Sequence, residues 1–183
     1  MAGFIFLGII LLILLWFIGT YNGFVKGKNL MREAWSGIDV QLKRRYDLIP
    51  NLVETVKGYS QHEKGLFEDV ARWRSQSMSA TTVKAKSEAE GALTEGLRSL
   101  FAVAEAYPEL KANQNFMELQ KSLEAIEDEL QLARRYFNGT VRDFNIRVES
   151  FPSAMVASLF NFKTADYFEV GNAAEREVPQ VKF

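Results

Sequence analysis

The sequence predicts an all-α protein in which an N-terminal transmembrane helix precedes an antiparallel four-helix bundle. Residues 2–18 are apolar or glycine throughout. From there to about residue 149, apolar residues recur at intervals of three and four, which is the period of amphipathic helices. No stretch alternates apolar and polar residues as a strand does. A chain of 183 residues has room for one such domain beside an anchor.

The predicted anchor covers residues 1–25. A helix needs roughly 20 mainly apolar residues to cross a bilayer, and the run "AGFIFLGIILLILLWFIGTYN" meets that length. Trp16 and Tyr21 suit the membrane interface, and Lys26 and Lys28 are the first charged residues of the chain. The alternative is a cleaved secretory signal, but no basic residue precedes the run and "WFIGTYNG" is a poor cleavage site. We therefore expect a retained anchor.

The orientation of the anchor follows from the basic residues near its ends. None precedes the apolar run, whereas Lys26, Lys28 and Arg32 follow it. Basic residues favour the cytoplasmic side of a membrane. The N-terminus is therefore predicted outside, with the bundle in the cytoplasm.

The bundle is predicted over residues 26–150. Four amphipathic helices with short links favour an up-and-down arrangement. The small, polar stretch "SQSMSATTVKAKS" suits the second link, Pro108 ends the third helix, and Asn113 or Asn115 suits the cap of the fourth. The expected helices cover about residues 26–46, 48–75, 86–107 and 114–149; an aromatic segment, residues 151–170, and a variable tail, residues 171–183, follow.

Pro50 interrupts the first helical pattern. In mid-helix it would remove the hydrogen bond to the carbonyl of Tyr46, at about 3 kcal/mol or more. A new helix that starts at residue 48, capped by Asp47, would avoid this cost. We therefore predict a helix corner at Asp47 and Pro50. The alternative is one kinked helix, which the unbroken apolar register from Leu42 to Val56 favours.

The aromatic segment "FPSAMVASLFNFKTADYF", from Phe151 to Phe168, leaves three alternatives open. It can pack over the end of the bundle, lie on the membrane surface, or contact a neighbouring subunit.

Polar residues interleave with the apolar stripes near the corner and along the fourth helix. We expect Arg45 to pair with Asp143, and Asn51 or Asn145 to satisfy helix ends. A network that fixes helix register is the favoured interpretation, and a site for an anionic headgroup or a partner is the alternative. The predicted network consists of Arg44, Arg45, Asp47, Asn51, Arg134, Asn138, Asp143 and Asn145.

The sequence offers little support for catalysis. The chain has no cysteine, and its only histidine, His62, stands in "HEKGL", which does not complete the HExxH zinc motif. Nucleophile-elbow and phosphate-loop motifs are missing, and a net charge of −1 does not favour nucleic acid. We expect no enzyme activity, catalytic residues, cofactor, metal or nucleic-acid partner.

Two blocks of the sequence resemble the signature of the LemA family. The first is "YNGFVKGKNLMREAWSGIDVQLKRRYDLIPNLVETVKGYSQHEK" and the second is "ARRYFNGTVRDFNIRVESFPSAMVASLFNF". The resemblance runs from the anchor to about Phe168. It implies a bacterial, single-pass membrane protein with an antiparallel four-helix bundle, and no established catalytic residues to carry over. The family's genes often lie near those of HtpX-type membrane metalloproteases and TPM-domain proteins, which implies a role in envelope upkeep.

We therefore expect a helical scaffold anchored in the bacterial inner membrane that self-assembles into a homo-oligomer and helps to organise or maintain the envelope. The alternative is an adaptor or binding module for a membrane protease or another envelope partner, such as a TPM-domain protein.

Overall fold

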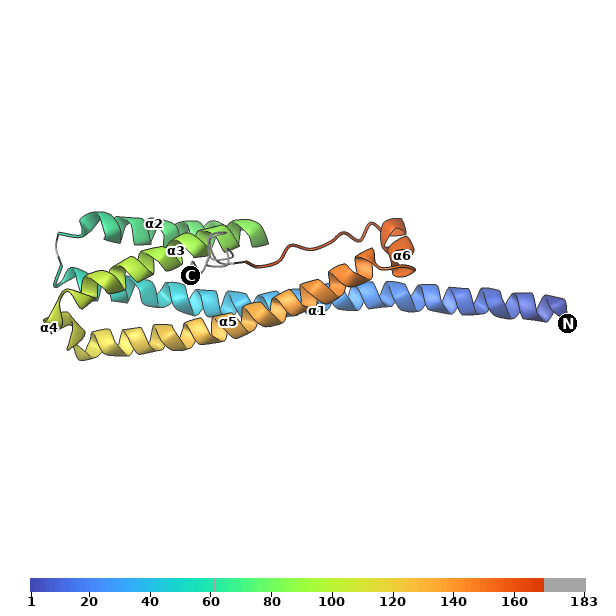
Figure 1. The fold of residues 1–183 in the computed structure, drawn as a ribbon, viewed down its shortest axis with the longest axis horizontal. Coiled ribbons are helices and arrows are strands. Elements are labelled where there is room, and N and C mark those ends of the chain that lie inside the picture. The colour runs from blue at the N-terminus through green and yellow to red at the C-terminus, as the bar shows by residue number, and fades with distance from the viewer. Residues whose placement is uncertain (61, 170–183) are drawn as a thin grey trace, which may run out of the picture. The chain divides into compact units, whose positions relative to one another are not determined.

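The computed structural model describes residues 1–60 and 62–169, and all regular structure within these ranges is helical. A long apolar N-terminal helix is followed by packed helices, which confirms the predicted fold class. The predicted tail, residues 171–183, lies outside the described residues. The helices are α1 (Ala2–Lys57), α2 (Lys64–Ser79), α3 (Val83–Glu105), α4 (Pro108–Lys111), α5 (Gln114–Glu149) and α6 (Ser153–Leu159) (Figure 1).

Helix α1 begins with the apolar run. Within the described part of the chain, it is the one helix long and apolar enough to cross a membrane. The side chains of this run are largely exposed, as a lipid-facing segment requires, because little of the protein packs against them. Trp16 and Tyr21 lie near its end, and the exposed Lys26 and Lys28 follow. This helix is consistent with a single-pass anchor.

The chain divides into two compact units, and the first contains residues Met1–Ile38 and Ala133–Tyr167. Its core joins α1, the end of α5, and α6. The ring of Phe24 stacks on Phe162 with centroids 4.8 Å apart and meets Phe144 edge-on at 6.0 Å. Val156 and Ala157 of α6 complete this core. The remaining side chains packed against it are Phe17, Met31 and Val148.

A turn after α6 brings Phe162 into that core. The N–H of Phe162 donates to the carbonyl of Ala157 at 2.9 Å, and the N–H of Asn161 donates to Ser158 at 3.3 Å. These two bonds form a Schellman motif, which needs a left-handed residue after the helix. Asn161 supplies it with a φ of 55°, a conformation that asparagine tolerates better than most residues.

Asn145 of α5 holds the chain beyond this turn. Its side-chain amide donates to the carbonyl of Ala165 at 2.9 Å and its oxygen accepts from the Ala165 N–H at 2.8 Å. The segment that begins at Phe151 therefore packs on α1 and α5 of its own chain through its buried side chains. For these side chains, the structure selects packing within the chain over the membrane surface and over a neighbouring subunit.

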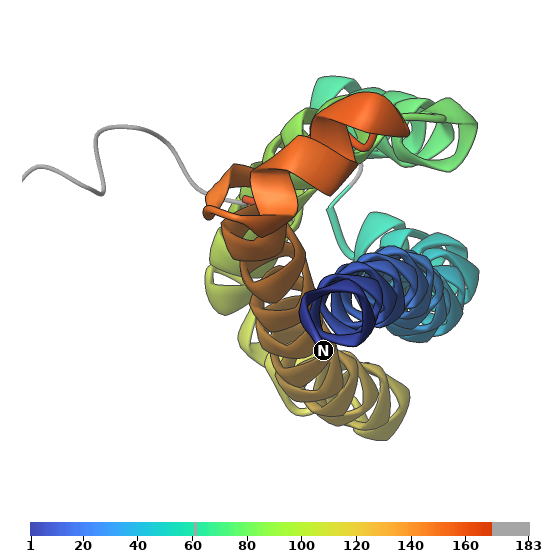
Figure 2. The same cartoon turned by 90° about the vertical axis from the view of Figure 1, so that its right-hand side faces the viewer.

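The second unit contains Asp39–Leu132 together with Phe168 and Glu169 of the described residues. Four helical segments run in alternating directions within it: the C-terminal part of α1, all of α2, all of α3, and the N-terminal part of α5 (Figure 1). Helices α2 and α3 lie side by side in both views (Figure 2). The buried apolar side chains include Leu42, Ile49, Leu52 and Val56 of α1, Phe67 and Val70 of α2, Leu93, Leu97 and Leu100 of α3, and Leu123, Ile126 and Leu130 of α5.

Side-chain caps start two helices of this unit. The hydroxyl of Thr82 accepts from the Ala85 N–H at 3.2 Å at the start of α3. The side-chain oxygen of Asn113 accepts from the Phe116 N–H at 3.1 Å at the start of α5. Each cap satisfies an amide that has no partner inside its helix.

The predicted corner at Asp47 and Pro50 is wrong. Helix α1 continues through both residues to Lys57, so the helices expected at residues 26–46 and 48–75 are replaced by α1 and the separate α2. Asp47 is not a cap; it is exposed and pairs with Lys43 at 3.4 Å.

A tertiary hydrogen bond explains why Pro50 is tolerated. Proline has no N–H, so the carbonyl of Tyr46, four residues earlier, loses its intrahelical donor. Arg74 of α2 replaces that donor, because its Nε lies 2.7 Å from the Tyr46 oxygen. Part of the cost of the proline is thus offset by a side chain from another helix.

Replacing Arg74 tests this contact. Arg74→Met keeps the aliphatic stem but leaves a largely buried carbonyl unsatisfied, so we expect the free energy of unfolding to fall by about 1–3 kcal/mol. In a Pro50→Ala background the new N–H of residue 50 satisfies the carbonyl, and the cost of Arg74→Met should shrink. Denaturant unfolding of the detergent-solubilised chain measures both. Arg72→Met, at an exposed site on the same helix, is the matched control. Equal losses in the two backgrounds would show that Arg74 acts through another contact.

Candidate functional site

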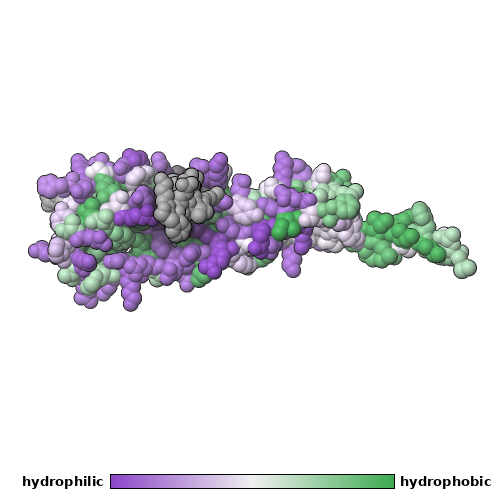
Figure 3. Space-filling model, viewed as in Figure 1, coloured by the Kyte–Doolittle hydropathy of each residue, from purple (hydrophilic) through white to green (hydrophobic). Residues whose placement is uncertain are grey.

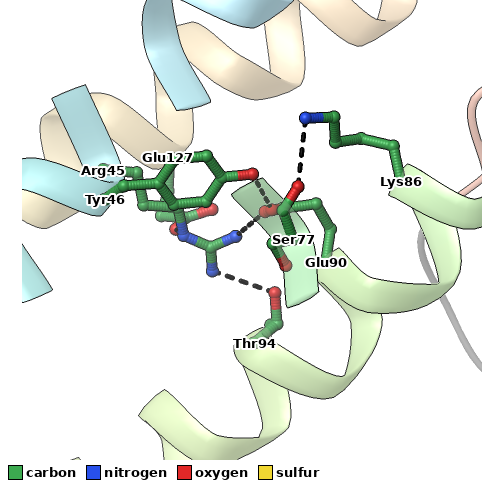
Figure 4. A network of polar contacts seen from close by, with 7 residues as sticks. All are labelled: Arg45, Tyr46, Ser77, Lys86, Glu90, Thr94 and Glu127. Carbon is green, nitrogen blue, oxygen red and sulfur yellow. Dashed lines mark hydrogen bonds and ion pairs between the residues drawn. The ribbon is translucent and has the colours of Figure 1, made fainter. Parts of the chain in front are cut away.

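A polar cluster lies inside the core of the second unit. Helix α1 contributes Arg45 and Tyr46, α3 contributes Glu90 and Thr94, and α5 contributes Glu127 (Figure 4). Arg45 is 1% exposed and Glu90 is fully buried at 0%. Charged side chains are rarely buried to this extent unless they are paired.

Arg45 is held by three partners. Its Nη1 donates to Glu90 Oε2 at 2.6 Å and its Nη2 donates to Thr94 Oγ1 at 2.9 Å. Its Nε lies 2.7 Å from Glu127 Oε1, a contact that is an ion pair rather than a well-directed hydrogen bond. The guanidinium fork is thus engaged along its whole edge, which is the arrangement a buried arginine requires.

Tyr46 binds the other oxygen of the same carboxylate. Its hydroxyl donates to Glu90 Oε1 at 2.5 Å, a length typical of a charge-assisted O–H···O⁻ bond. Burial, and then the negative charge of Glu90, raise the pKa of the Tyr46 phenol well above its usual value. The phenol therefore stays protonated and remains a donor at physiological pH.

The cluster lies where the apolar stripes of the helices meet. Arg45 shares one face of α1 with Leu42 and Ile49, at a spacing of three and four residues. Glu90 precedes Leu93 and Leu97 on the buried face of α3 with the same spacing. Each charged residue therefore occupies a position that the helix period assigns to the core.

Sequence reasoning placed Arg45 in a network but missed its partners. The sequence signal for burial of Glu90 is its position three residues before Leu93, on the same helix face as the apolar stripe that starts there. Glu127 gave no such signal, because it stands in a run of acidic residues with Asp128 and Glu129, although it lies one residue after the buried Ile126. No sequence signal connected Arg74 or Thr94 to the cluster, because both contacts depend on how the helices pack.

The predicted pairing of Arg45 with Asp143 is wrong. Asp143 does not fill that role: it is exposed and accepts from Arg142 of its own helix at 2.9 Å. Glu90 and Glu127 neutralise Arg45 instead. A fully buried carboxylate has few alternatives to such pairing, because an unpaired charge in the core is strongly disfavoured.

The other predicted network residues are dispersed. Arg44 is exposed and donates to Gln41 at 3.1 Å. Asn51 is exposed and Asp47 pairs with Lys43, so neither satisfies a helix end. The asparagine that satisfies main-chain groups is Asn145, which binds Ala165 as described above. The half-buried members of the predicted set are Arg134 and Asn138.

The chemistry open to the cluster is limited by its own contacts. The donors of Arg45 and Tyr46 point at carboxylates and at a hydroxyl of the same cluster, which joins α1, α3 and α5. Within residues 1–60 and 62–169, no group of three or more His, Cys, Asp or Glu side chains is arranged to hold a metal ion. The geometry fits a structural junction that sets helix register.

A hollow of about 510 Å³ opens beside this junction. Its wall is largely apolar, with Leu97, Phe101 and Leu123 as its main apolar residues. Arg45, Thr94 and Glu127 form part of its lining. The hollow is large enough to take an apolar side chain of another molecule.

Comparison with known proteins identifies the family. The model of the LemA family matches residues 34–183, which is most of the chain. The chain belongs to the LemA family. The matched region contains the Arg45 junction, the whole second block of the sequence resemblance, and the first block from Ala34 on.

Curated relatives of the chain include magnetosome proteins. It is 24% identical to magnetosome protein MamQ of Magnetospirillum gryphiswaldense, over 88% of this chain and 70% of that protein. It is also 24% identical to MamQ 2 of Paramagnetospirillum magneticum, over 86% and 68%. Protein LemA of Metamycoplasma hominis is 22% identical over 88% of this chain and 74% of its own length.

The buried ion pair makes the first prediction for this LemA-family junction. Glu90→Gln removes the charge that neutralises Arg45 in the core, so we expect the free energy of unfolding to fall by about 3–5 kcal/mol. Asp47→Asn removes an exposed ion pair with Lys43 and should change it by at most about 0.5 kcal/mol. Adding Arg45→Met to Glu90→Gln should recover part of the loss. Denaturant unfolding compares the variants, and similar small losses for Glu90→Gln and Asp47→Asn would contradict a structural role.

The raised pKa of Tyr46 makes a second prediction. A group with a higher pKa in the folded state stabilises the fold fully below its unfolded pKa, about 10 for tyrosine, and loses that contribution as the pH rises further. The free energy of unfolding should therefore fall above pH ~10, by up to about 1.4 kcal/mol per pH unit from this group. Tyr46→Phe should show a shallower fall, measured by denaturant unfolding between about pH 8 and 11. Parallel curves would show that Tyr46 does not contribute.

Proposed function

We propose that this LemA-family protein is a membrane-anchored helical scaffold, and not an enzyme, that self-assembles at the bacterial inner membrane to organise or maintain the envelope. The supporting observation is a face of α5 in the first unit that carries two exposed apolar side chains. Tyr136 and Ile146 are each 54% exposed, and they share one helix face with Gly139 and Asp143 at intervals of three and four residues.

The features of this α5 face suit contact with another helix. Apart from the neighbours of Gly139 along its own helix, no described residue lies within 4 Å of the position that a Cβ of Gly139 would occupy. A second backbone can therefore approach between Tyr136 and Ile146, which would bury both side chains. Exposed apolar side chains grouped on one face are typical of protein–protein contact sites.

Anchoring favours a second copy as the occupant of this face. If α1 spans the membrane, all copies share one plane and one orientation. Confinement raises their effective concentration, so weak lateral contacts suffice for assembly. The polar junction around Arg45 supports the same proposal, because pairing between its helices gives the domain a defined register.

The orientation belongs to the proposal as well. Lys26, Lys28 and Arg32 follow the apolar run and are exposed, which favours a cytoplasmic domain and an N-terminus on the outside. The comparison with MamQ, named as a magnetosome protein in two organisms, supports a bacterial context for this chain.

The alternative function is an adaptor for a membrane protease or a TPM-domain protein. The hollow beside Arg45 favours it, because Leu97, Phe101 and Leu123 offer an apolar pocket on the domain surface. A partner that inserts an apolar side chain there would not need the α5 face.

The mass of the particle extracted in mild detergent distinguishes these functions. We expect the wild-type chain to form a homomer, and Tyr136→Lys combined with Ile146→Lys to yield monomers. Met78→Lys, at a similarly exposed site on α2, should leave the homomer intact. A monomer with a different protein attached would favour the adaptor. A lone monomer, with no partner after crosslinking in cells, would contradict both functions.

A further inference from the structure

Helix α6 is apolar on both of its sides. Val156 and Ala157 are buried in the core of the first unit. On the other side Met155 and Leu159, spaced four residues apart, are 65% and 69% exposed, and Phe151, in the turn before the helix, is 84% exposed. A soluble domain does not usually present three such large apolar side chains in a row to water.

The position of α6 shows what lies next to this side. The ring of Phe160 lies 4.7 Å from Tyr21 and 5.8 Å from Phe17, so α6 rests against the end of the apolar run of α1. The green surface of that run is followed directly by a paler green surface at α6 (Figure 3).

The dimensions of a bilayer place this contact at the membrane boundary. A helical span of roughly 20 residues that starts at Ala2 ends near Tyr21. The headgroup region extends roughly 5–8 Å beyond the hydrocarbon core, which is about three to five residues of helix. Because α6 contacts α1 at residues 17 and 21, it lies at the level where hydrocarbon gives way to headgroups.

A basic side chain stands at the same level. The guanidinium of Arg147 lies over Gly23, in space that a Cβ there would fill. Within the described residues, no carboxylate pairs with Arg147. It borders a hollow of about 480 Å³ whose other lining residues are Trp16, Gly19, Thr20, Pro152 and Ser153.

We propose that Phe151, Met155, Leu159 and Arg147 form a lipid-contact surface. The three apolar side chains enter the boundary between headgroups and acyl chains in the leaflet on the side of the domain. Arg147, about one helical turn further from the hydrocarbon core than Thr20, binds a lipid phosphate. Short apolar faces beside basic residues bind membranes in this way.

Lipid is the occupant that the observations favour. The surface adjoins the part of α1 that faces lipid in any membrane the protein spans, so lipid is present at high concentration beside it. A second copy would have to displace that lipid. The proposal rests on insertion of α1 and does not require self-assembly.

Single-cysteine labelling tests the apolar part, because the chain has no cysteine of its own. Full-length Met155→Cys and Leu159→Cys carry a nitroxide in vesicles of phosphatidylcholine and phosphatidylglycerol. We expect both labels to collide more with O₂ and less with a water-soluble nickel chelate than a label at Glu33→Cys, an exposed site on α1. A label at Leu12→Cys checks independently that α1 is inserted.

Two outcomes would overturn the proposal. Accessibilities at residues 155 and 159 that equal those at residue 33 would show that the surface faces water. Protection from both O₂ and the nickel chelate would show that protein covers it. Repeating the measurement with Tyr136→Lys and Ile146→Lys removes the α5 face, so failure of self-assembly and failure of lipid contact are distinguishable.

The role of Arg147 needs its own comparison. In the Leu159→Cys background, adding phosphatidylglycerol to phosphatidylcholine vesicles should lower collision of the label with the nickel chelate. Arg147→Gln should abolish this shift, whereas Lys28→Gln, a neighbouring exposed cation, should leave most of it. The same shift in both variants would contradict phosphate binding by Arg147.

Discussion

The second unit is organised by the need to keep the charge of Arg45 compensated inside an apolar core. A guanidinium cannot lose its proton in a protein, so its burial is possible only where acceptors surround it. Glu90 and Glu127 supply negative charge from α3 and α5, and Thr94 supplies a hydroxyl. A shift of either helix by one turn would leave a buried charge without its partner. This constraint selects one register among the many that the leucine stripes alone would allow.

The elements that could be predicted from the sequence are those governed by local periodicity. The apolar run of α1 and the helix over residues 114–149 follow from hydrophobic pattern and capping, and the structure places α5 at Gln114–Glu149. The continuity of α1 through Pro50 could not be predicted in the same way. Its compensation comes from Arg74, which is remote in sequence and becomes relevant only when α2 packs on α1. The partners of Arg45 were missed for the same reason: pairing between helices depends on packing that no single helix encodes.

Several residues that carry the family resemblance form contacts between helices in this protein. In the first block, Arg45 is the centre of the junction and Pro50 sets up the contact with Arg74. In the second, Asn145 binds the chain after α6, and Phe162 stacks on α1. In this chain, these residues of the LemA signature join helices and chain segments to one another.

The hydrogen bond between Arg74 and the carbonyl of Tyr46 also orders events during synthesis. A ribosome makes Pro50 well before Arg74. When α1 leaves the ribosome, the carbonyl of Tyr46 beside the proline ring therefore has no protein donor. In water that carbonyl is hydrated at little cost, and only docking of α2 can replace the water with a permanent donor. If the apolar run spans a membrane, it can therefore be inserted while the far end of the same helix still lacks this hydrogen bond. Completion of α1 then becomes a late event, coupled to closure of the domain that it supports.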